Sequence, residues 1–512
     1  MKNPLSVFLL VAVAALPAAA LSASTPTAPH VGIDWFDGDV DAAFSQARLQ
    51  NKPLFLYWGA AWCPPCNQVK ATIFKRADFI ARSRFFVPVN LDGDSAGAQK
   101  LGARFKVRGY PTTILFRPDG SEITRLPGEV DAARYLKVLG LGMKATHPVK
   151  ETLQAALTAP AKLHADDWHL LSFYSWDTDE QALVEQAQRA ATLQRLADNA
   201  PPGDAKIRLR LLALVAAANL KPDGQAGIDV PLARANLLAV FGDRVQSRTN
   251  ADVLNNYASK LVEANSAADS ARRTQLIAAG RTALAQLARD TTLSTTDQLA
   301  ARVAEIALAH LGNPTAPLDA PLLNAAQQQV TAADHNTTDA YERQSVISAA
   351  GDVLTDAGLL DASDRLLNAE LKRSHSPYYF MLGLAANAKK RGDKTAALNW
   401  YEQAYAASKG PATRLQWGTS YLNNLIELAP ADEPRIEKAA HSLFGELTDM
   451  PDAFYERNRL RLEKLAHALN GWKAERHQAA FGRMAAQLNS ICSKLSGADP
   501  QRAICQGLLV SG

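Results

Sequence analysis

The sequence has few cysteines for its length. Only 4 of its 512 residues are cysteine, too few for a fold that depends on a dense disulfide framework. A chain of this length exceeds the size at which one hydrophobic core stops growing, about 250–300 residues, so more than one packed region is expected. The four cysteines fall into two pairs, which need separate explanations: Cys63 with Cys66, and Cys492 with Cys505.

An excess of one charge sign is also missing. Lys and Arg number 55 and Asp and Glu number 51, without the blocks of like charge that bind phosphate backbones or anionic lipid. We therefore expect no nucleic acid as a partner. Beyond the N-terminus no apolar run reaches the roughly 20 residues of a spanning helix, so no stable membrane insertion is expected either.

Histidines with metal-ligand spacing are absent. The chain has 10 His, and those such as His164 and His169 are scattered, as is typical of surface or satisfied core residues. A zinc site at Cys63 and Cys66 would need two further ligands, and the second cysteine pair lies in a different region of the chain. We expect no metal and no cofactor.

The N-terminus has the pattern of a secretory signal. Lys2 precedes an apolar run from Leu5 to Leu16, and small residues follow Pro17. Residues 1–23 are predicted to be a signal peptide, cleaved after Ala20 or after Ala23. Cleavage would place the mature chain in the periplasm.

Residues 24–146 show the alternation of an α/β domain. Strands are expected over 54–58, 85–91, 113–116 and 122–126, and helices over 41–50, 66–74, 96–105 and 131–139.

Residues 147–512 change in character, because Ala and Leu dominate and helical periodicity continues almost to the end. Gly358 and Gly392 are 34 residues apart, as are Pro377 and Pro411, which is the tetratricopeptide period. Small or bulky residues stand where two packed helices require them: Leu384, Ala385, Gly392, Ala397, Tyr401 and Ala404. We predict an all-helical region with tetratricopeptide-like repeats near 344–411. The upstream copy is weaker, since Glu370 occupies a small-residue position.

The segment Trp62-Cys63-Pro64-Pro65-Cys66 follows a predicted strand and opens a predicted helix. This spacing lets two sulfurs bond within the first helical turn, where the helix dipole stabilises a thiolate on the outer cysteine. Cys63 is the expected nucleophile and Cys66 the resolving thiol.

Together with the Lys52-Pro53-Leu54-Phe55-Leu56 strand and the Val107 to Thr112 loop, this segment resembles the thioredoxin superfamily over about residues 34–140. The loop and the strand entry are most similar to thioredoxin-7-like proteins, relatives of the periplasmic C-terminal domain of the transmembrane disulfide reductase. The resemblance implies that Pro111 is cis and that the Tyr110 backbone pairs with an extended substrate segment. It also implies a buried Asp six residues before the first cysteine. Tyr57 stands there instead, and a tyrosine is a poor base at neutral pH.

The direction of electron flow follows from the two prolines. Pro64 and Pro65 lack an N–H, so the Cys63 thiolate is only moderately stabilised, which favours a protein-disulfide reductase over a strong oxidant. Its partners would be disulfide-bearing client proteins and an upstream membrane disulfide reductase. A disulfide oxidase or isomerase is the alternative, as is a helical scaffold with a docking thioredoxin-like domain.

Cys492 and Cys505 flank a predicted loop between two helices. A disulfide there would staple a terminal hairpin and be structural. The alternative is a second redox pair that exchanges electrons with Cys63 and Cys66. The helical region itself is expected to select clients on a concave face.

Overall fold

The computed structural model describes residues 32–107, 109–128, 131–180, 183–220, 228–312, 317–473 and 477–509. The predicted signal peptide, residues 1–23, lies outside the described residues. Among the residues that the structure describes, no helix is both long enough and apolar enough to cross a membrane.

The chain first builds a sheet of four strands in the order β2-β1-β3-β4. The strands are β1 (Leu54–Gly59), β2 (Val87–Asp92), β3 (Thr112–Phe116) and β4 (Glu122–Leu126). β1 pairs parallel with β2 and antiparallel with β3, and β3 pairs antiparallel with β4. Every residue of β1 is buried, because helices cover both faces of the sheet and the strand is apolar throughout.

Five helices complete this N-terminal domain. They are α1 (Val40–Gln50), α2 (Pro64–Thr72), α3 (Ala77–Ser83), α4 (Ala98–Phe105) and α5 (Ala132–Gly142). The sequence patterns located four of these within a few residues but did not separate α3 from the segment before β2.

Beyond α5, the regular elements in the described ranges are helical, apart from one isolated bridge between Val107 and Asp179. They are α6 (Val149–Thr158), η1 (Pro160–Lys162), α7 (Ala165–Ser172), α8 (Gln186–Asn199), α9 (Asp204–Ala218), α10 (Val230–Gly242), α11 (Arg244–Thr249), α12 (Ala251–Ala264), α13 (Ala271–Leu287), α14 (Thr295–Gly312), α15 (Ala320–Asn336), α16 (Ala340–Asp356), α17 (Leu360–Glu370), α18 (Pro377–Lys390), α19 (Lys394–Ala407), α20 (Pro411–Leu428), α21 (Glu433–Glu446), η3 (Leu447–Asp449), α22 (Glu456–Lys473), α23 (Gln478–Lys494) and α24 (Pro500–Leu508). The predicted fold class, an α/β domain followed by a large all-helical region, is confirmed.

The 34-residue period corresponds to one helical hairpin. α18 begins at Pro377, α19 packs against it, and α20 begins at Pro411. Gly392 ends the first helix with a φ of +78°, a conformation that favours glycine. The misfit at Glu370 has a local explanation, because its buried carboxylate pairs with the Arg343 guanidinium at 2.6 Å.

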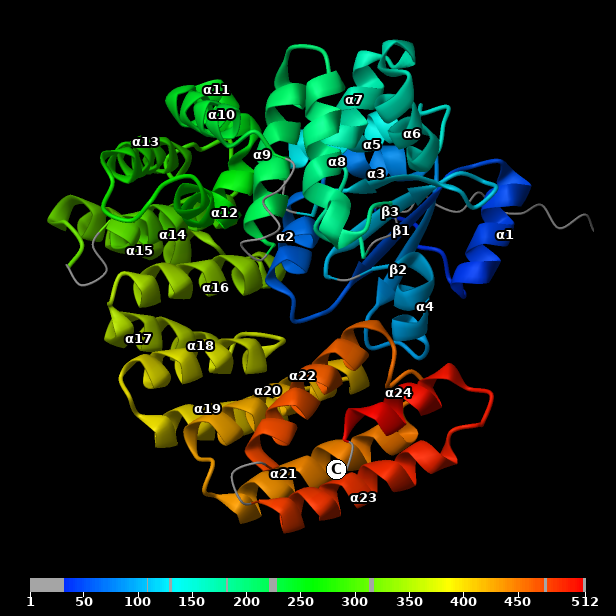
Figure 1. Ribbon diagram of the computed structural model, residues 1–512, viewed down its shortest axis with the longest axis vertical. Helices are drawn as coiled ribbons and strands as arrows, with labels where there is room; N and C mark the ends of the chain where they lie inside the picture. The colour runs from blue at the N-terminus through cyan, green and yellow to red at the C-terminus, as the bar shows by residue number, and fades with distance from the viewer. Residues whose placement is uncertain are drawn as a thin grey trace, which may run out of the picture.

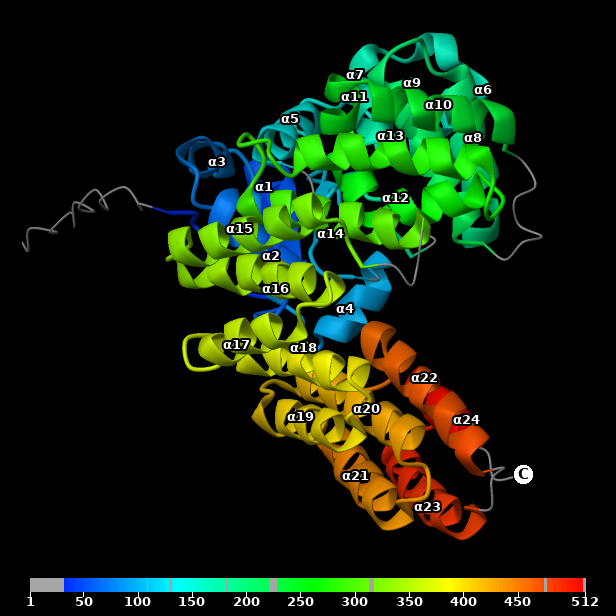
Figure 2. The ribbon, with the colours of Figure 1, turned by 90° about the vertical axis from the view of Figure 1, so that its left-hand side faces the viewer.

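The helical region curves around the N-terminal domain, which lies on the inner side of the arc (Figures 1 and 2). α16 packs against α2, and α22 packs against α4. Helices that are distant in the sequence therefore contact the N-terminal domain at two places. One hydrophobic core runs through both parts, from Phe55 and Cys66 to Trp417 and Phe481. The inner face that was expected to select clients is therefore filled by the chain's own α/β domain.

Candidate redox site

Cys63 and Cys66 lie at the start of α2, directly after the strand that crosses the middle of the sheet. They are joined as a disulfide with Cα atoms 5.2 Å apart. Cys63 is the N-cap residue of α2, and its sulfur accepts a hydrogen bond from the Cys66 amide at 3.2 Å. This contact places the outer sulfur at the positive end of the helix dipole, where a thiolate is stabilised.

The residues around the pair explain why the chain turns there. Pro64 and Pro65 occupy the first two helical positions, where a missing N–H costs no intrahelical hydrogen bond. The buried Asn67 side chain donates to the Ala61 and Cys63 carbonyl oxygens at 2.8 and 2.9 Å. Asn67 thus ties the loop before the helix to its first turn, a contact that the sequence analysis missed.

The Tyr110-Pro111 peptide bond is cis, at the entry to β3. Thr112 pairs with Trp58 near the end of β1, so the register of the sheet brings this loop to the edge at which the cysteine segment begins. The Trp62 and Tyr110 ring centroids are 6.2 Å apart. The structure therefore gathers the residues singled out in the sequence at one end of the sheet.

Tyr57, in the position of the buried Asp, is itself buried, and its hydroxyl donates to the Cys66 carbonyl oxygen at 3.4 Å. Burial, together with the nearby Tyr135 and Asp92, raises the pKa of Tyr57 far above its usual value. The phenol stays protonated and cannot accept a proton from the resolving thiol.

Helices of the distant helical region cover this end of the sheet. The Trp62 indole N–H donates to the Thr413 hydroxyl at 2.9 Å, and the ring lies edge-on to Trp417 with centroids 4.7 Å apart. The Tyr379 ring of α18 is nearly parallel to the Trp62 ring, with centroids 6.1 Å apart. Trp62 retains 8% of its exposure, Cys63 2% and Cys66 none.

A carboxylate in the loop after β2 anchors α20 to this site. Asp94 accepts from the Thr413 amide at 2.7 Å and from its hydroxyl at 2.5 Å. Thr413 lies in the first turn of α20, where an anion is favoured by the helix dipole. The result is a hydrogen-bond chain from Trp62 through Thr413 to Asp94.

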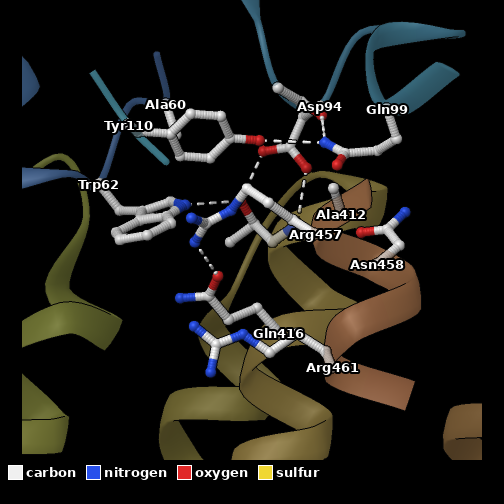
Figure 3. A pocket seen from close by; sticks show the side chains of 12 residues that line it. Ala60, Trp62, Asp94, Gln99, Tyr110, Ala412, Gln416, Arg457, Asn458 and Arg461 are labelled. Carbon is white, nitrogen blue, oxygen red and sulfur yellow. Dashed lines mark hydrogen bonds between the residues drawn. The ribbon is translucent and has the colours of Figure 1, made fainter. Parts of the chain in front are cut away.

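A small cavity lies between the two parts of the chain beside Trp62 (Figure 3). Tyr110 and Asp94 face it from one side, and Gln416, Arg457 and Arg461 face it from α20 and α22. The Arg457 guanidinium lies 4.3 Å from the Tyr110 ring centroid, a cation–π contact, and donates to the Gln416 side-chain oxygen at 2.8 Å.

Sequence patterns could not reveal these contacts. Thr413 is 351 residues from Trp62 along the chain, and no local periodicity or spacing relates the two. The same holds for Gln68 of α2, whose amide nitrogen donates to the Asp297 carboxylate of α14 at 2.8 Å.

The second cysteine pair is also bonded. Cys492 of α23 and Cys505 of α24 have Cα atoms 5.6 Å apart, and both are fully buried. Their hairpin packs on α21 and α22. Among the residues that the structure describes, no cluster of His, Cys, Asp and Glu has the geometry of a metal site.

The N-terminal domain is similar to known proteins. Residues 40–142 match the family described as a thioredoxin-like domain. The thiol:disulfide interchange protein DsbD of Pseudomonas fluorescens is 32% identical over 103 residues, which are 19% of this chain and 18% of that protein. DsbD 2 of Pseudomonas aeruginosa is 30% identical over 102 residues, 19% and 17% of the two chains.

A solved structure titled DsbH oxidoreductase has 20% sequence identity and a TM-score of 0.21, covering 23% of this chain and 92% of its own. The chain spans less than a fifth of the length of these DsbD relatives. Residues 40–142 therefore form a thioredoxin-like domain, homologous to the matching segments of the DsbD proteins and carrying the Cys63–Cys66 pair.

Proposed function

We propose that this protein is an exported thiol-disulfide oxidoreductase that reduces disulfides in client proteins. The observation that carries the proposal is the Cys63–Cys66 disulfide at the N-terminus of α2, beside the cis-proline loop. This arrangement can form and break one disulfide reversibly, which is the chemistry of the relatives named thiol:disulfide interchange proteins.

In the reaction, the Cys63 thiolate attacks one sulfur of the client disulfide. A mixed disulfide forms, and the other client sulfur leaves as a thiolate. The Cys66 thiolate then attacks the Cys63 sulfur, which closes the Cys63–Cys66 disulfide and releases the second client thiol. The client gains two electrons and the protein loses them.

The surrounding residues have supporting roles in this proposal. Trp62, Tyr110 and Pro111 shape the surface beside Cys63, and Pro64 and Pro65 limit the amides that stabilise its thiolate. Of the first-turn amides, the one from Cys66 is placed on the Cys63 sulfur. Moderate stabilisation of the thiolate favours the reducing direction over the oxidising one.

A reductant in an oxidising compartment needs a source of electrons. We propose that residues 1–23 direct the chain to the periplasm and that a membrane disulfide reductase returns the Cys63–Cys66 pair to the dithiol. Residues 24–146 then form the redox domain and 147–512 the helical region, stapled near its end by Cys492 and Cys505.

Equilibration of the full-length mature chain with thiol buffers tests the proposal. A reversible couple more negative than about −180 mV is expected for a reductase, against about −120 mV for a strong periplasmic oxidant. Cys63→Ser with Cys66→Ser is the control and should abolish the couple. A potential near that of the oxidant would reverse the direction of the reaction, and the lack of a couple would overturn the function.

A further inference from the structure

The surface that a client must approach is occupied by the chain itself. Disulfide exchange requires the client sulfur to reach Cys63, so the rate depends on access to that atom. Cys63 and the neighbouring Trp62 are buried, with exposed fractions of 2% and 8%. We call Trp62, Cys63, Tyr110 and Pro111 the redox face.

Contacts from the helical region reach the backbone on the Trp62 side of the redox face. His375, just before α18, has Nε2 3.0 Å from the Ala61 carbonyl oxygen. The Gln344 amide of α16 donates to the Trp62 carbonyl oxygen at 3.5 Å. Both carbonyls belong to the turn that presents Cys63, so this turn is held by the helices as well as by its own domain.

The loop side of the redox face is covered in the same way. Arg457 of α22 lies over the Tyr110 ring. The backbone N–H of Gln99 in α4 donates to the Asp452 carboxylate, just before α22, at 2.9 Å. An extended client segment pairing with the Tyr110 backbone would enter between these elements, in the space that the helical region now fills.

The interface between α20 and the thioredoxin-like domain contains polar as well as apolar contacts. Asp94 and Trp62 both bond to Thr413, and hydrogen bonds of this kind give only modest net stability, because water replaces them when they break. Interfaces between domains of one chain commonly allow relative motion unless they are large and hydrophobic. Here Tyr379 and Trp417 add apolar contacts to Trp62, so the opening is a local separation around Trp62 and not an unfolding of the shared core. Such an interface can keep α20 on the redox face most of the time and still allow it to separate.

We propose that α18 and α20 occupy the docking site of a client polypeptide, and that they must separate from the redox face before Cys63 exchanges with a protein disulfide. This inference rests on the proposed function. It assigns the helical region the role of a cover that excludes large substrates from the dithiol.

Labelling of one thiol with two reagents of different size tests the cover. In a full-length Cys66→Ser variant, Cys63 is the free thiol, because Cys492 and Cys505 are bonded and buried. N-ethylmaleimide and a maleimide bearing a polyethylene glycol chain react by the same chemistry. The ratio of their rates therefore reports access and cancels the reactivity of the thiolate.

Thr413→Ala in this background should open the cover. It removes the acceptor of the Trp62 indole N–H and one of the donors to Asp94. Labelling by the large reagent should rise roughly tenfold, which corresponds to about 1.4 kcal/mol in the closed-to-open equilibrium. Thr413→Ser keeps the hydroxyl and should restore slow labelling. Thr419→Ala on the same helix is the matched control, because the Thr419 hydroxyl donates to the Gln416 carbonyl oxygen within α20.

Asp94→Ala provides the same test from the thioredoxin-like domain and should also speed labelling. Equal rates for both reagents in the Cys66→Ser chain would overturn the proposal, as would equal rates in Thr413→Ala and Thr419→Ala. Thiol-buffer equilibration of the wild-type chain is run beside the labelling. The lack of a reversible couple there would overturn the proposed function, and this inference with it, whatever the labelling rates.

Discussion

At the scale of single residues, Gly102 lies where the two parts of the chain pack closely together. It lies in α4, and a Cβ atom there would be 2.6 Å from the Trp58 ring and 3.2 Å from the Glu456 side chain of α22. The absence of a side chain therefore lets α22 pack directly on α4.

Gly102→Ala should lower the free energy of unfolding by about 1–3 kcal/mol, because the added methyl group overpacks a filled site. Gly482→Ala is the matched control. Gly482 is exposed in α23 with no atom within 4 Å of an added Cβ, so this change should stabilise by about 0.5–1 kcal/mol. Urea unfolding of both variants measures the difference. Equal effects would mean that the α4–α22 contact is looser than described.

Tyr57 provides a second test at this scale. Since burial keeps the phenol protonated, Tyr57→Phe should leave the rate of mixed-disulfide resolution unchanged. Quenched-flow kinetics with a model disulfide from pH 6 to pH 9 would measure it. A slower or differently pH-dependent resolution in Tyr57→Phe would show that the hydroxyl takes part in proton transfer.

At the scale of elements, the packing of α16 on α17 depends on a buried ion pair. Arg343 bonds to both oxygens of Glu370, and also to the Asp334 carboxylate and the Thr337 carbonyl oxygen. Removal of Glu370 leaves the buried Arg343 charge with Asp334 as its remaining carboxylate partner.

Glu370→Ala should therefore destabilise the protein by about 1–3 kcal/mol, because Arg343 loses its buried bonds to Glu370 but keeps Asp334. The double variant Arg343→Met with Glu370→Leu should recover most of this loss, since it removes both charges and keeps apolar volume. Thermal or urea unfolding of the two proteins compares them. If the double variant is as unstable as the single one, packing rather than charge dominates the site.

The contact between α22 and the thioredoxin-like domain also contains a carboxyl group that titrates in an unusual range. Burial, then the hydrogen bond and charge of the neighbouring Glu180, raise the pKa of Glu456 to about 8. Arg459 and Lys106 face the same group and act in the opposite direction. Glu456 is thus held in its protonated form at neutral pH.

The folded chain binds this proton more tightly than the unfolded chain, where the pKa is 4.5. The stabilising contribution is therefore complete below about pH 4.5 and is lost as the pH rises to about 8. Glu456→Gln should flatten the decline in stability across this window. The comparison is the pH profile of unfolding for the variant and the wild type. Parallel profiles would contradict the assignment.

The helices and strands themselves were largely predictable. The short apolar, β-branched or aromatic runs placed all four strands, and the bounds of β4 match the prediction of 122–126. The sequence patterns missed α3, which is short and whose N-cap Arg76 makes no side-chain capping bond. The role of Glu370 was also hidden, because its partner Arg343 lies on the preceding helix and no local rule relates the two.

At the scale of the whole molecule, the thioredoxin-like domain and the C-terminal helices share one core. Phe55 of β1 and Trp417 of α20 belong to the same buried cluster, whereas Leu254 of α12 belongs to a separate one. The shared core predicts that β1 and the C-terminal helices unfold together.

Trp417→Ala, a loss of about 3–5 kcal/mol, should lower the hydrogen-exchange protection of β1 amides as much as that of α20 amides. Leu254→Ala is the control and should affect α12 without the same loss in β1. Native-state hydrogen exchange read by mass spectrometry separates the segments. Unchanged protection of β1 in Trp417→Ala would show that the two parts open independently.

The arrangement of the whole was the least predictable part. The cysteine spacing, the proline loop and the helical period are local signals, and each corresponds to what the structure contains. The covering of Trp62 by Thr413 and Trp417 arises from the path of the helical arc, which depends on small rotations accumulated over many hairpins. A local sequence pattern does not show this accumulated rotation.

Both disulfides, finally, are buried in the folded chain. A protein with the proposed reductase activity would reduce its own second disulfide if the redox pair could reach it. Cys492 and Cys505 are fully buried between α23 and α24, and exchange needs a thiolate to approach a sulfur along the S–S axis. Under the proposed function, packing thus protects the Cys492–Cys505 disulfide even when the Cys63–Cys66 pair of the same molecule is reduced.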